Sequence, residues 1–276
     1  MGRRFAVKIT GALITLDEEK NLPRALASLA FCDEIVVLDS GSSDRTLELA
    51  RQAGARVDHR DWTGYADQKN AAAALASHDW ILSLDADEEV TPELAASIGR
   101  LREEGPTADG YAFPRRARYL GRWIRHSGWY PDAKVRLYDR RKARWRGDYV
   151  HESVTVEGTT ERLEGDLLHY TCDTFSQHIL TVDRYTTLAA LQMQAAGRRP
   201  GLLRLLTAPV WTSFRTYVLQ RGFLDGYQGF LIAAMAGFYV FAKYAKARQG
   251  APADAHRPPR LRTRAARRPT PGTAAL

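Results

Sequence analysis

The stretch Ile81-Leu82-Ser83-Leu84-Asp85-Ala86-Asp87-Glu88-Glu89 is an apolar run that ends in four acidic residues, and it is the most informative part of this sequence. In an extended backbone, residues two positions apart point to the same side, so Asp85 and Asp87 can face one ligand. Two carboxylates this close repel each other unless a positive charge lies between them. A hard divalent cation with oxygen ligands is the natural candidate. The alternative is an acidic loop after a strand, with Glu88 and Glu89 as solvated charges.

Size and composition are those of an ordinary globular protein. The chain has 276 residues, of which 45% are apolar and 26% charged, so a substantial core is possible. Charge is unevenly distributed: residues 1–112 hold 12 Lys/Arg and 20 Asp/Glu, and residues 113–276 hold 28 and 12. An acidic front half and a basic back half suggest two tasks, the second of which faces something anionic.

The cysteines and the N-terminus indicate a reducing compartment. Cys32 and Cys172 lie far apart in unlike contexts, which favours two reduced buried thiols over a disulfide framework. The first apolar stretch is interrupted by Lys8 and runs into acidic residues from Asp17 without a cleavage-like site. We therefore expect no signal peptide and a cytoplasmic catalytic part.

Strand and helix signals alternate through the first hundred residues. Strands are expected at 7–16, 34–38, 55–57 and 80–84, and helices at 21–29, 47–53 and 65–77 and from Thr91, a plausible cap. This alternation predicts an α/β fold with a mostly parallel sheet covered by helices. Ligands of such sheets lie at the carboxyl ends of the strands, where the acidic loops at Asp39 and Asp85 are placed.

The character of the chain changes after residue 113. Residues 114–148 carry 12 Lys/Arg, three Asp and several Trp and Tyr, which is typical of short strands and turns. The chain is predicted to be helical from 174 to about 249. The uncharged stretch 226–242 is short for a membrane span of about 20 apolar residues, so a buried or interfacial helix is favoured. The Pro-, Ala- and Arg-rich tail from 250 is predicted to be disordered.

Two polar segments accompany the acidic strand end. In Asp39-Ser40-Gly41-Ser42-Ser43-Asp44, the glycine permits a tight turn and the small residues let backbone approach a ligand. The alternative is an ordinary connection in which Ser43 or Asp44 caps the next helix. Lys69 could meet a phosphate and Asn70 a ribose or a backbone group, unless both belong to a plain polar helical turn.

A third segment, His151-Glu152, combines a possible metal ligand with a possible proton acceptor. The alternative is an exposed polar pair on a strand. The aromatic and basic window before it is compatible with a nucleic-acid surface, but no recognisable nucleic-acid motif accompanies it. Sugar rings also stack on aromatic side chains, so we expect no nucleic-acid partner.

Taken together and in order, these pieces resemble glycosyltransferase family 2, the inverting nucleotide-sugar enzymes with a GT-A fold. The resemblance covers residues 8–115 and is carried by Ile14-Thr15-Leu16, Asp17-Glu18-Glu19-Lys20-Asn21, Asp39-Ser40-Gly41-Ser42-Ser43-Asp44, Gln68-Lys69-Asn70 and Leu84-Asp85-Ala86-Asp87-Glu88. Later segments resemble the bacterial lipopolysaccharide-core β-1,4-glucosyltransferase branch, which adds glucose to an inner-core heptose. They are Gly128-Trp129-Tyr130-Pro131-Asp132, Arg136-Leu137-Tyr138, Trp145-Arg146-Gly147, Val150-His151-Glu152, and Gly222-Phe223-Leu224-Asp225-Gly226 with Lys243-Tyr244.

Two positions depart from the family pattern. Many members have a second Asp after the first in the Asp39 loop, where it contacts uracil, and this chain has Ser40. The usual Arg before Asn70 is Lys69, which keeps the charge. Uridine specificity is therefore less secure than the reaction type.

The resemblance implies a nucleotide-sugar donor, with UDP-glucose expected, bound across the strand ends with Mg²⁺ or Mn²⁺. Asp87 would ligate the metal, Asp85 would face the ribose or the metal, and His151 would be a third metal contact. Glu152 is the expected general base, with Asp132 and Asp148 as alternatives. The residues expected to hold the donor are Thr15, Asp17, Asp39, Ser40, Lys69, Asn70 and Asp85.

The implied organisation divides the chain into four parts. Residues 1–115 and 116–172 would form the nucleotide-sugar and acceptor halves of one GT-A domain, followed by a helical membrane-proximal extension (173–249) and a basic tail (250–276). The expected acceptor is a lipid-linked oligosaccharide, and the enzyme would lie peripherally on the anionic inner face of the bacterial inner membrane. A polyprenyl-phosphate glycosyltransferase and a non-enzymatic protein that binds anionic polymers are the alternatives.

Overall fold

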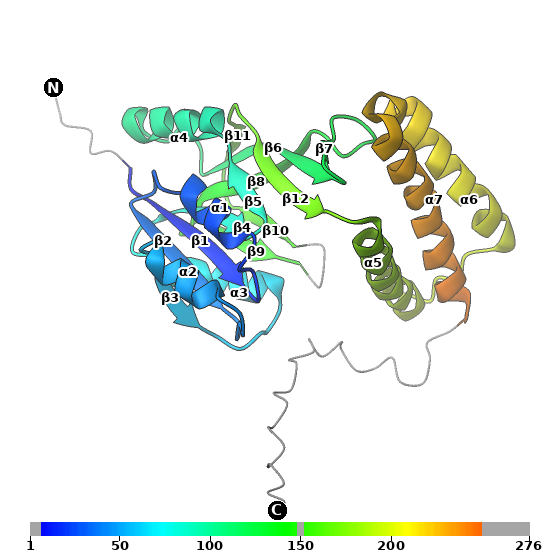
Figure 1. Ribbon diagram of the computed structural model, residues 1–276, viewed down its shortest axis with the longest axis horizontal. Coiled ribbons are helices and arrows are strands. Elements are labelled where there is room, and N and C mark those ends of the chain that lie inside the picture. The colour runs from blue at the N-terminus through cyan, green and yellow to red at the C-terminus, as the bar shows by residue number, and fades with distance from the viewer. Residues whose placement is uncertain (1–6, 148–151, 250–276) are drawn as a thin grey trace, which may run out of the picture.

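The computed structural model describes residues 7–147 and 152–249 of the chain (Figure 1). A large sheet forms one half of the molecule, and three long helices lie beside it as a separate layer. Asp148, His151 and the predicted tail lie outside the described residues.

The sheet has the strand order β3-β2-β1-β4-β8-β6-β12-β5. Neighbours are parallel from β3 to β4, β8 runs antiparallel to both of its neighbours, and β12 is again parallel to β6. Its strands are β1 (Ile9–Thr15), β2 (Glu34–Asp39), β3 (Arg56–His59), β4 (Trp80–Asp85), β5 (Glu88–Val90), β6 (Gly110–Tyr119), β8 (Asp132–Asp139) and β12 (Leu167–Cys172). Both β7 (Arg122–Trp123) and β11 (Thr160–Arg162) pair with β6, and β9 (Ala143–Arg146) and β10 (Ser153–Val156) form a separate antiparallel pair.

Apolar clusters cover both faces of the sheet. On one face, Ile9 and Leu13 of β1 belong to a core that includes buried residues of α1 (Leu22–Ser28), α2 (Thr46–Gln52) and α4 (Pro92–Glu104). On the other face, Ala12 joins a cluster with α3 (Tyr65–Leu75) and the β9 residue Trp145. Successive strand residues point to opposite faces, so a strand buried on both sides has to be a continuous apolar run.

The predicted α/β class, with a mostly parallel sheet flanked by helices and a C-terminal helical extension, is confirmed. Thr91 caps α4 as expected by accepting a hydrogen bond from the Leu94 N–H at 3.3 Å. The expected cap of α2 is wrong in detail, because its N-cap is Arg45, while Asp44 accepts from the Thr46 N–H at 2.9 Å. Cys32 and Cys172 are both free thiols. The boundary placed at residue 115 falls inside β6, so the two predicted halves share one sheet.

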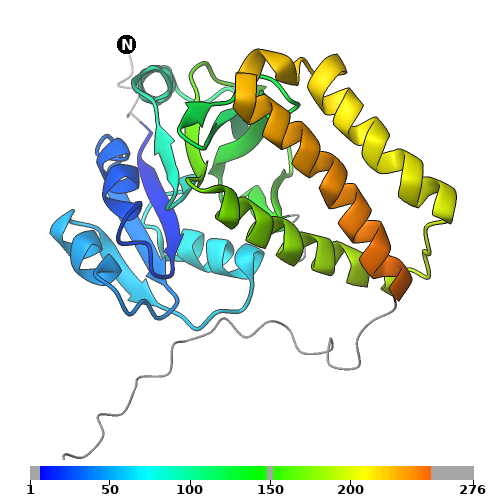
Figure 2. The same cartoon turned by 45° about the vertical axis from the view of Figure 1, so that its right-hand side comes forward.

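The extension consists of α5 (Phe175–Ala195) and a helical hairpin of α6 (Leu202–Phe214) and α7 (Gly226–Gln249) (Figure 2). A short π-helix, η1 (Arg215–Leu219), and a 3₁₀ turn, η2 (Gly222–Asp225), connect α6 with α7. By length and composition, the stretch Gly222–Gln249 could cross a membrane, although 28% of its most apolar window is buried inside the structure. The helix is thus longer than the uncharged stretch 226–242 suggested.

A buried carboxylate ties the extension to the sheet domain. Asp225 is 2% exposed and accepts hydrogen bonds from the backbone N–H groups of Arg125 (3.1 Å) and His126 (2.9 Å), next to β7. Its removal would leave these two partly buried donors without their carboxylate acceptor.

We expect Asp225→Ala to lower the free energy of unfolding by about 2–4 kcal/mol, because unpaired buried donors are costly. Asp225→Asn should cost less, since one side-chain oxygen remains an acceptor. Asp183→Ala is the control, because Asp183 is 73% exposed in its ion pair with Lys246 and such pairs contribute less than about 1 kcal/mol. Urea unfolding measures the differences, and equal losses in the Asp225 and Asp183 variants would contradict the anchoring role.

Candidate active site

The carboxyl ends of three neighbouring strands bring the predicted polar residues together. In the parallel register, Thr15 of β1 lies opposite Asp39 of β2, and Ile14 lies opposite Asp85 of β4. The acidic loops that are 46 residues apart in the sequence therefore emerge at the same edge of the sheet. This edge is where parallel sheets bind ligands.

Asp39 organises the loop that follows it. It is 1% exposed and accepts hydrogen bonds from the Thr15 hydroxyl at 2.9 Å and from the backbone N–H groups of Gly41 and Ser42 at 2.8 Å each. Gly41 has a φ of +101°, a conformation that favours glycine. Both carboxylate oxygens of Asp39 are engaged within the loop, so this side chain has little capacity left to accept a hydrogen bond from the nucleobase of a donor.

The loop after β1 interlocks with the Asp39 loop. The Asp17 N–H donates to the Ser42 hydroxyl at 2.9 Å, and the Ser43 N–H donates to the Asp17 carboxylate at 2.7 Å. On the other side, the Ser40 hydroxyl accepts from the Gln68 amide at 2.8 Å. The structure thus gathers Thr15, Asp17, Asp39 and Ser40 into one network whose small side chains leave backbone accessible.

Buried charges of alternating sign form a ladder at the end of β4. Asp85 lies 2.7 Å from the Lys69 ammonium and 2.7 Å from the Arg136 guanidinium, and Arg136 lies 2.8 Å from Glu88. Lys69 and Arg136 are each 4% exposed, and Glu88 is fully buried. We call Lys69, Asp85, Arg136 and Glu88 the charge ladder. Positive side chains, rather than a metal, hold these two carboxylates together.

Two members of the charge ladder, Asp85 and Arg136, have shifted pKa values. Burial alone raises the pKa of Asp85, but the charges of Arg136 and Lys69 outweigh it and hold that pKa well below its usual range. Burial lowers the pKa of Arg136, but the negative charges of Asp85 and Glu88 outweigh burial and raise that pKa above its ordinary value. Asp85 and Arg136 are therefore both ionised at neutral pH.

Arg136 and Glu88 are functional candidates to which sequence reasoning gave no role. The Nε and Nη1 atoms of Arg136 are buried and have no hydrogen-bond partner within the described residues. A buried guanidinium with free N–H donors, close to the edge of the sheet where ligands bind, is suited to an anionic ligand. The available signals were the segment Arg136-Leu137-Tyr138, which carries part of the resemblance, and the position of this arginine between Val135 and Leu137 in β8.

Lys69 and Asn70 lie at the site in unlike roles. Lys69 projects into the ladder and stacks over the Trp145 ring, with 4.2 Å from Nζ to the ring centroid. Asn70 exchanges two hydrogen bonds of 2.9 Å with the backbone of Trp145. Asn70 was expected to contact a ribose or a backbone group. The structure shows the contact with backbone, and this contact holds β9 against α3.

Glu152 lies beside the ladder. Its Oε1 atom is 3.7 Å from the Lys69 ammonium, while its Oε2 atom is buried and has no partner within the described residues. A buried carboxylate oxygen without a hydrogen-bond donor costs folding free energy, unless a bound ligand donates a hydrogen bond to it. The geometry is thus compatible with the predicted base.

The two alternatives for the base are less favourably placed. Asp132 is bound by Arg115 at 2.7 Å and Lys134 at 3.0 Å, and these cations outweigh burial and lower its pKa, which weakens it as a base. Asp148 lies outside the described residues, as does His151, the predicted third metal contact.

Asp87 faces a histidine that the motif analysis missed. The His169 Nε2 atom lies 3.2 Å from the Asp87 carboxylate, and the other ring nitrogen is 3.1 Å from the Thr171 hydroxyl. Such a contact on the second nitrogen orients a metal-binding imidazole. His169 lies 82 residues after Asp87 in a short apolar strand, and nothing local marks it.

The donor set at Asp87 fits a divalent cation that is shared with a ligand. Residues 7–147 and 152–249 contain no group of three or more His, Cys, Asp or Glu able to hold a metal ion. One carboxylate and one imidazole, however, match sites in which Mg²⁺ or Mn²⁺ also takes phosphate oxygens and water. The oxygens of Asp85 are engaged by the ladder, so Asp87 and His169 are the residues that could hold the ion.

The helical extension borders the site through α5. Burial raises the pKa of Tyr185, and Tyr65, Glu152 and Asp87 raise it further. Tyr185 therefore lies within electrostatic reach of Glu152, the predicted base, and Asp87, the predicted metal ligand, in agreement with the position of α5 in Figure 2.

Comparison with known proteins identifies relatives over nearly the whole chain. The family model "Glycosyl transferase family 2" matches residues 12–159, more than half of the chain. "Lipopolysaccharide core biosynthesis glycosyltransferase LpsC" from Rhizobium meliloti (strain 1021) is 31% identical over 245 residues, covering 86% of this chain and 91% of that protein. An "Uncharacterized glycosyltransferase" from Rickettsia felis is 30% identical over 263 residues, covering 88% and 90%.

A solved structure shows a weaker likeness. Glucosyl-3-phosphoglycerate synthase from Mycobacterium tuberculosis, in complex with Mn²⁺, uridine-diphosphate and glucosyl-3-phosphoglycerate, is 25% identical, covers 42% of this chain and 45% of that one, and has a TM-score of 0.34. At that score the likeness says nothing about the ligands of this chain.

Replacement of Arg136 tests the charge ladder. Arg136→Met should lower the free energy of unfolding at about pH 7 by about 3–5 kcal/mol, because Asp85 and Glu88 lose the cation between them. In the wild type, the lowered pKa of Asp85 gives stability that is complete above its unfolded value of about 4 and is lost as pH falls towards the folded pKa. In the variant, protonation relieves the repulsion, so the difference should shrink on acidification.

Urea unfolding at neutral and acid pH measures this difference. Arg136→Lys is the matched control and should retain part of the stability, because the charge remains. A difference between Arg136→Met and wild type that is the same at both pH values would show that the ladder is not electrostatic.

Proposed function

The chain belongs to glycosyl transferase family 2, and from this premise we propose that it transfers a hexose from a nucleotide-diphospho-sugar to an inner-core sugar of lipopolysaccharide, with inversion at the anomeric carbon. The donor proposed is UDP-glucose. The observation that carries the proposed chemistry is the buried, unpartnered Oε2 atom of Glu152 beside Lys69 at the carboxyl edge of the sheet.

The strand-end loops would hold the donor. The nucleoside would lie along the backbone of the interlocked loops of Thr15, Asp17, Asp39 and Ser40, because their polar side chains already bond to one another. The unused guanidinium nitrogens of Arg136 would receive the negative charge of the diphosphate. Asp85 would act as a positioning residue, since both of its oxygens are ion-paired.

Asp87 and His169 would hold Mg²⁺ or Mn²⁺ against the diphosphate. A divalent cation there would offset the negative charge that develops on the leaving group. The two side chains already face each other, since the His169 Nε2 atom lies 3.2 Å from the Asp87 carboxylate, and these are the atoms that would bind the metal ion.

Glu152 would complete the transfer as the general base. The acceptor hydroxyl would lose its proton to Oε2 of Glu152 while its oxygen attacks C1 of the sugar from the face opposite the diphosphate. The bond from C1 to the diphosphate oxygen would break, and the nucleoside diphosphate would leave with the electron pair. Lys69, 3.7 Å from Oε1, would hold the carboxylate in position for this step.

The acceptor class is supported by the LpsC relative, whose printed role is lipopolysaccharide core biosynthesis. We propose that the helical extension brings the enzyme to the inner face of the inner membrane, where a lipid-linked acceptor would reach the site past α5. Purified enzyme with labelled UDP-glucose and defined acceptors tests this. Transfer to a polyprenyl phosphate in place of a core oligosaccharide would overturn the proposed acceptor.

Glu152→Gln should reduce turnover by about 10²–10⁴-fold, because the variant cannot take the acceptor proton. Binding of UDP, measured by thermal shift, should survive. Glu157→Gln on the neighbouring turn is the control, since Glu157 is 78% exposed, and it should remain active. Near-normal turnover of the Glu152 variant would remove this residue as the base.

Asp87→Asn and His169→Ala should each weaken Mn²⁺-dependent binding of UDP by about 10–100-fold, because each removes one protein donor. The stabilisation by UDP with and without Mn²⁺, read as a shift in Tm, measures the loss. His78→Ala, on the turn between α3 and β4, is the control. Unchanged Mn²⁺-dependent shifts in both variants would contradict the proposed metal site.

A further inference from the structure

Exposed apolar side chains are confined to the helical extension. Within the described residues, all 18 exposed large hydrophobic side chains lie between Phe175 and Phe241, and none lies on the sheet domain. Soluble surfaces rarely gather apolar residues in this way without a partner.

The outer helix, α6, carries the most exposed of them. None of its residues is buried, and Leu203, Leu206 and Val210 are 75%, 67% and 70% exposed. Together with Phe214, which is 47% exposed, they recur at intervals of three and four residues and form one face of the helix. Figures 1 and 2 place α6 at the edge of the molecule, far from the sheet. We call these four residues the outer face of α6.

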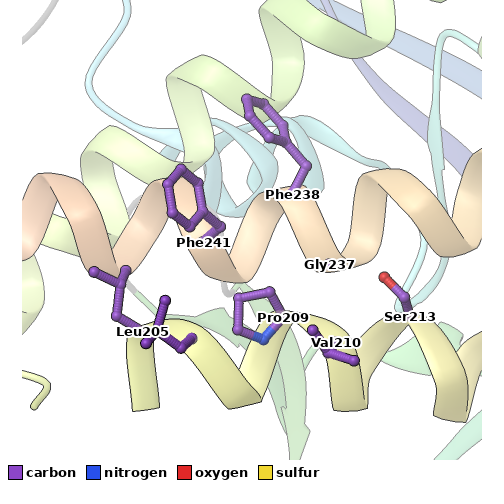
Figure 3. A pocket seen from close by; sticks show the side chains of 8 residues that line it. Leu205, Pro209, Val210, Ser213, Gly237, Phe238 and Phe241 are labelled. Carbon is purple, nitrogen blue, oxygen red and sulfur yellow. The ribbon is translucent and has the colours of Figure 1, made fainter. Parts of the chain in front are cut away.

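An apolar groove lies between α6 and α7 and opens onto the outer face of α6. It has a volume of about 290 Å³ and is lined by Leu205, Pro209 and Val210 of α6 and by Phe238 and Phe241 of α7 (Figure 3). Two residues of the outer face, Leu206 and Val210, are thus also part of its lining. The helices approach closely beside it, because a Cβ atom on Gly237 would lie 2.1 Å from the Ser213 hydroxyl and 2.8 Å from the Pro209 carbonyl. The hairpin is therefore a packed unit in which α7 contacts both α5 and α6, while Phe238 and Phe241 stay 48% and 44% exposed.

A basic pocket adjoins the apolar groove. It has a volume of about 480 Å³, its charged lining residues are Arg198, Arg199, Arg204 and Lys243, and no Asp or Glu is among its described lining residues. Arg204 directly precedes the groove residue Leu205, and Lys243 follows Phe241 by two positions. A cationic pocket that continues into an apolar groove matches the head and chain of an anionic lipid.

Charge favours a bilayer over a second copy of the chain. Residues 174–249 hold nine Lys/Arg and two Asp. Of the two acids, Asp225 is buried and Asp183 is paired with Lys246. A two-fold dimer through this face would bring the same basic pockets towards each other and would be repelled.

We propose that the α6–α7 hairpin binds an anionic membrane surface, with a lipid phosphate in the basic pocket and the outer face of α6 among the acyl chains. The inference rests on the proposed function in one respect: a membrane-linked acceptor is the reason why the enzyme would bind a membrane. The hairpin lies in the interface, and α7 does not span the bilayer.

Flotation of the full-length protein with vesicles tests this proposal. The protein should bind phosphatidylcholine vesicles that contain phosphatidylglycerol and bind pure phosphatidylcholine weakly. Replacing Arg198, Arg199 and Arg204 together by Gln should lower partitioning onto the anionic vesicles on the order of 100-fold, since each surface cation contributes roughly tenfold or slightly less. The control replaces Lys8, Arg51 and Arg162, which are exposed on the sheet domain, by Gln and should bind like the wild type.

A second variant tests the apolar contact. Replacing Leu203, Leu206 and Val210 together by Ser should abolish binding to either kind of vesicle while the protein stays folded, because α6 contributes no buried residue. Circular dichroism and the thermal shift with UDP check the fold and the donor site separately, so loss of UDP binding alone would count against the proposed function only. A wild type that stays off anionic vesicles, basic-pocket and control variants that bind equally, or a stable dimer that buries α6 would overturn the inference.

Discussion

The ion pairs of Asp85 with Lys69 and Arg136 are the constraint on which the rest of the site depends. An apolar strand that ends in closely spaced carboxylates needs positive charge at the same depth. Lys69 comes from α3 and Arg136 from β8, so satisfying Asp85 fixes a helix on one face and an antiparallel strand at the edge of β4. Each element is thereby placed by an interaction whose loss would leave a buried charge unpaired.

The same constraint explains how the charges are divided between structure and function. Lys69 is committed to Asp85 at 2.7 Å and lies farther, at 3.7 Å, from Glu152. Within residues 7–147 and 152–249, the Oε2 atom of Glu152 has no hydrogen-bond partner. Over the same residues, Arg136 uses one nitrogen for both carboxylates and has two buried nitrogens without a partner. The ladder and Glu152 beside it thus present one free acceptor and two free donors, the groups to which we assign the transfer reaction.

Local sequence patterns were sufficient to predict the elements of the first hundred residues. They failed for site residues that lie on strands far along the chain. Apolar runs and loop chemistry correctly predicted β1, β2 and β4 and the meeting of Asp39 with Asp85, because parallel strands with intervening helices place their carboxyl ends at one edge. The partners Arg136 and His169 lie on β8 and β12, more than 50 residues after the aspartate that each of them contacts. The segment around Arg136 was noticed without its role as a partner of Asp85, and nothing local marks His169. Hydropathy also indicated an apolar extension, but it could not show that α6 is turned outward, since that depends on how α5 and α7 cover each other.

The position of α5 connects the membrane surface with the chemistry. Tyr185 on α5 lies in the electrostatic field of Glu152 and Asp87, and the same helix is joined to α7 by the contact of Lys246 with Asp183 and Thr186. At the other end, Asp225 holds the start of α7 against the backbone beside β7. The extension is therefore fixed to the sheet domain at two separated points, at the start of α7 through Asp225 and on α5 through His178, whose Nδ1 atom lies 2.8 Å from the Tyr119 hydroxyl of β6. A hairpin bound to a bilayer as proposed would then also set the height and tilt of the strand ends above it. If the proposed membrane contact and lipid-linked acceptor hold, a rigid mount of this kind would select acceptors by their distance from the membrane as well as by their chemistry.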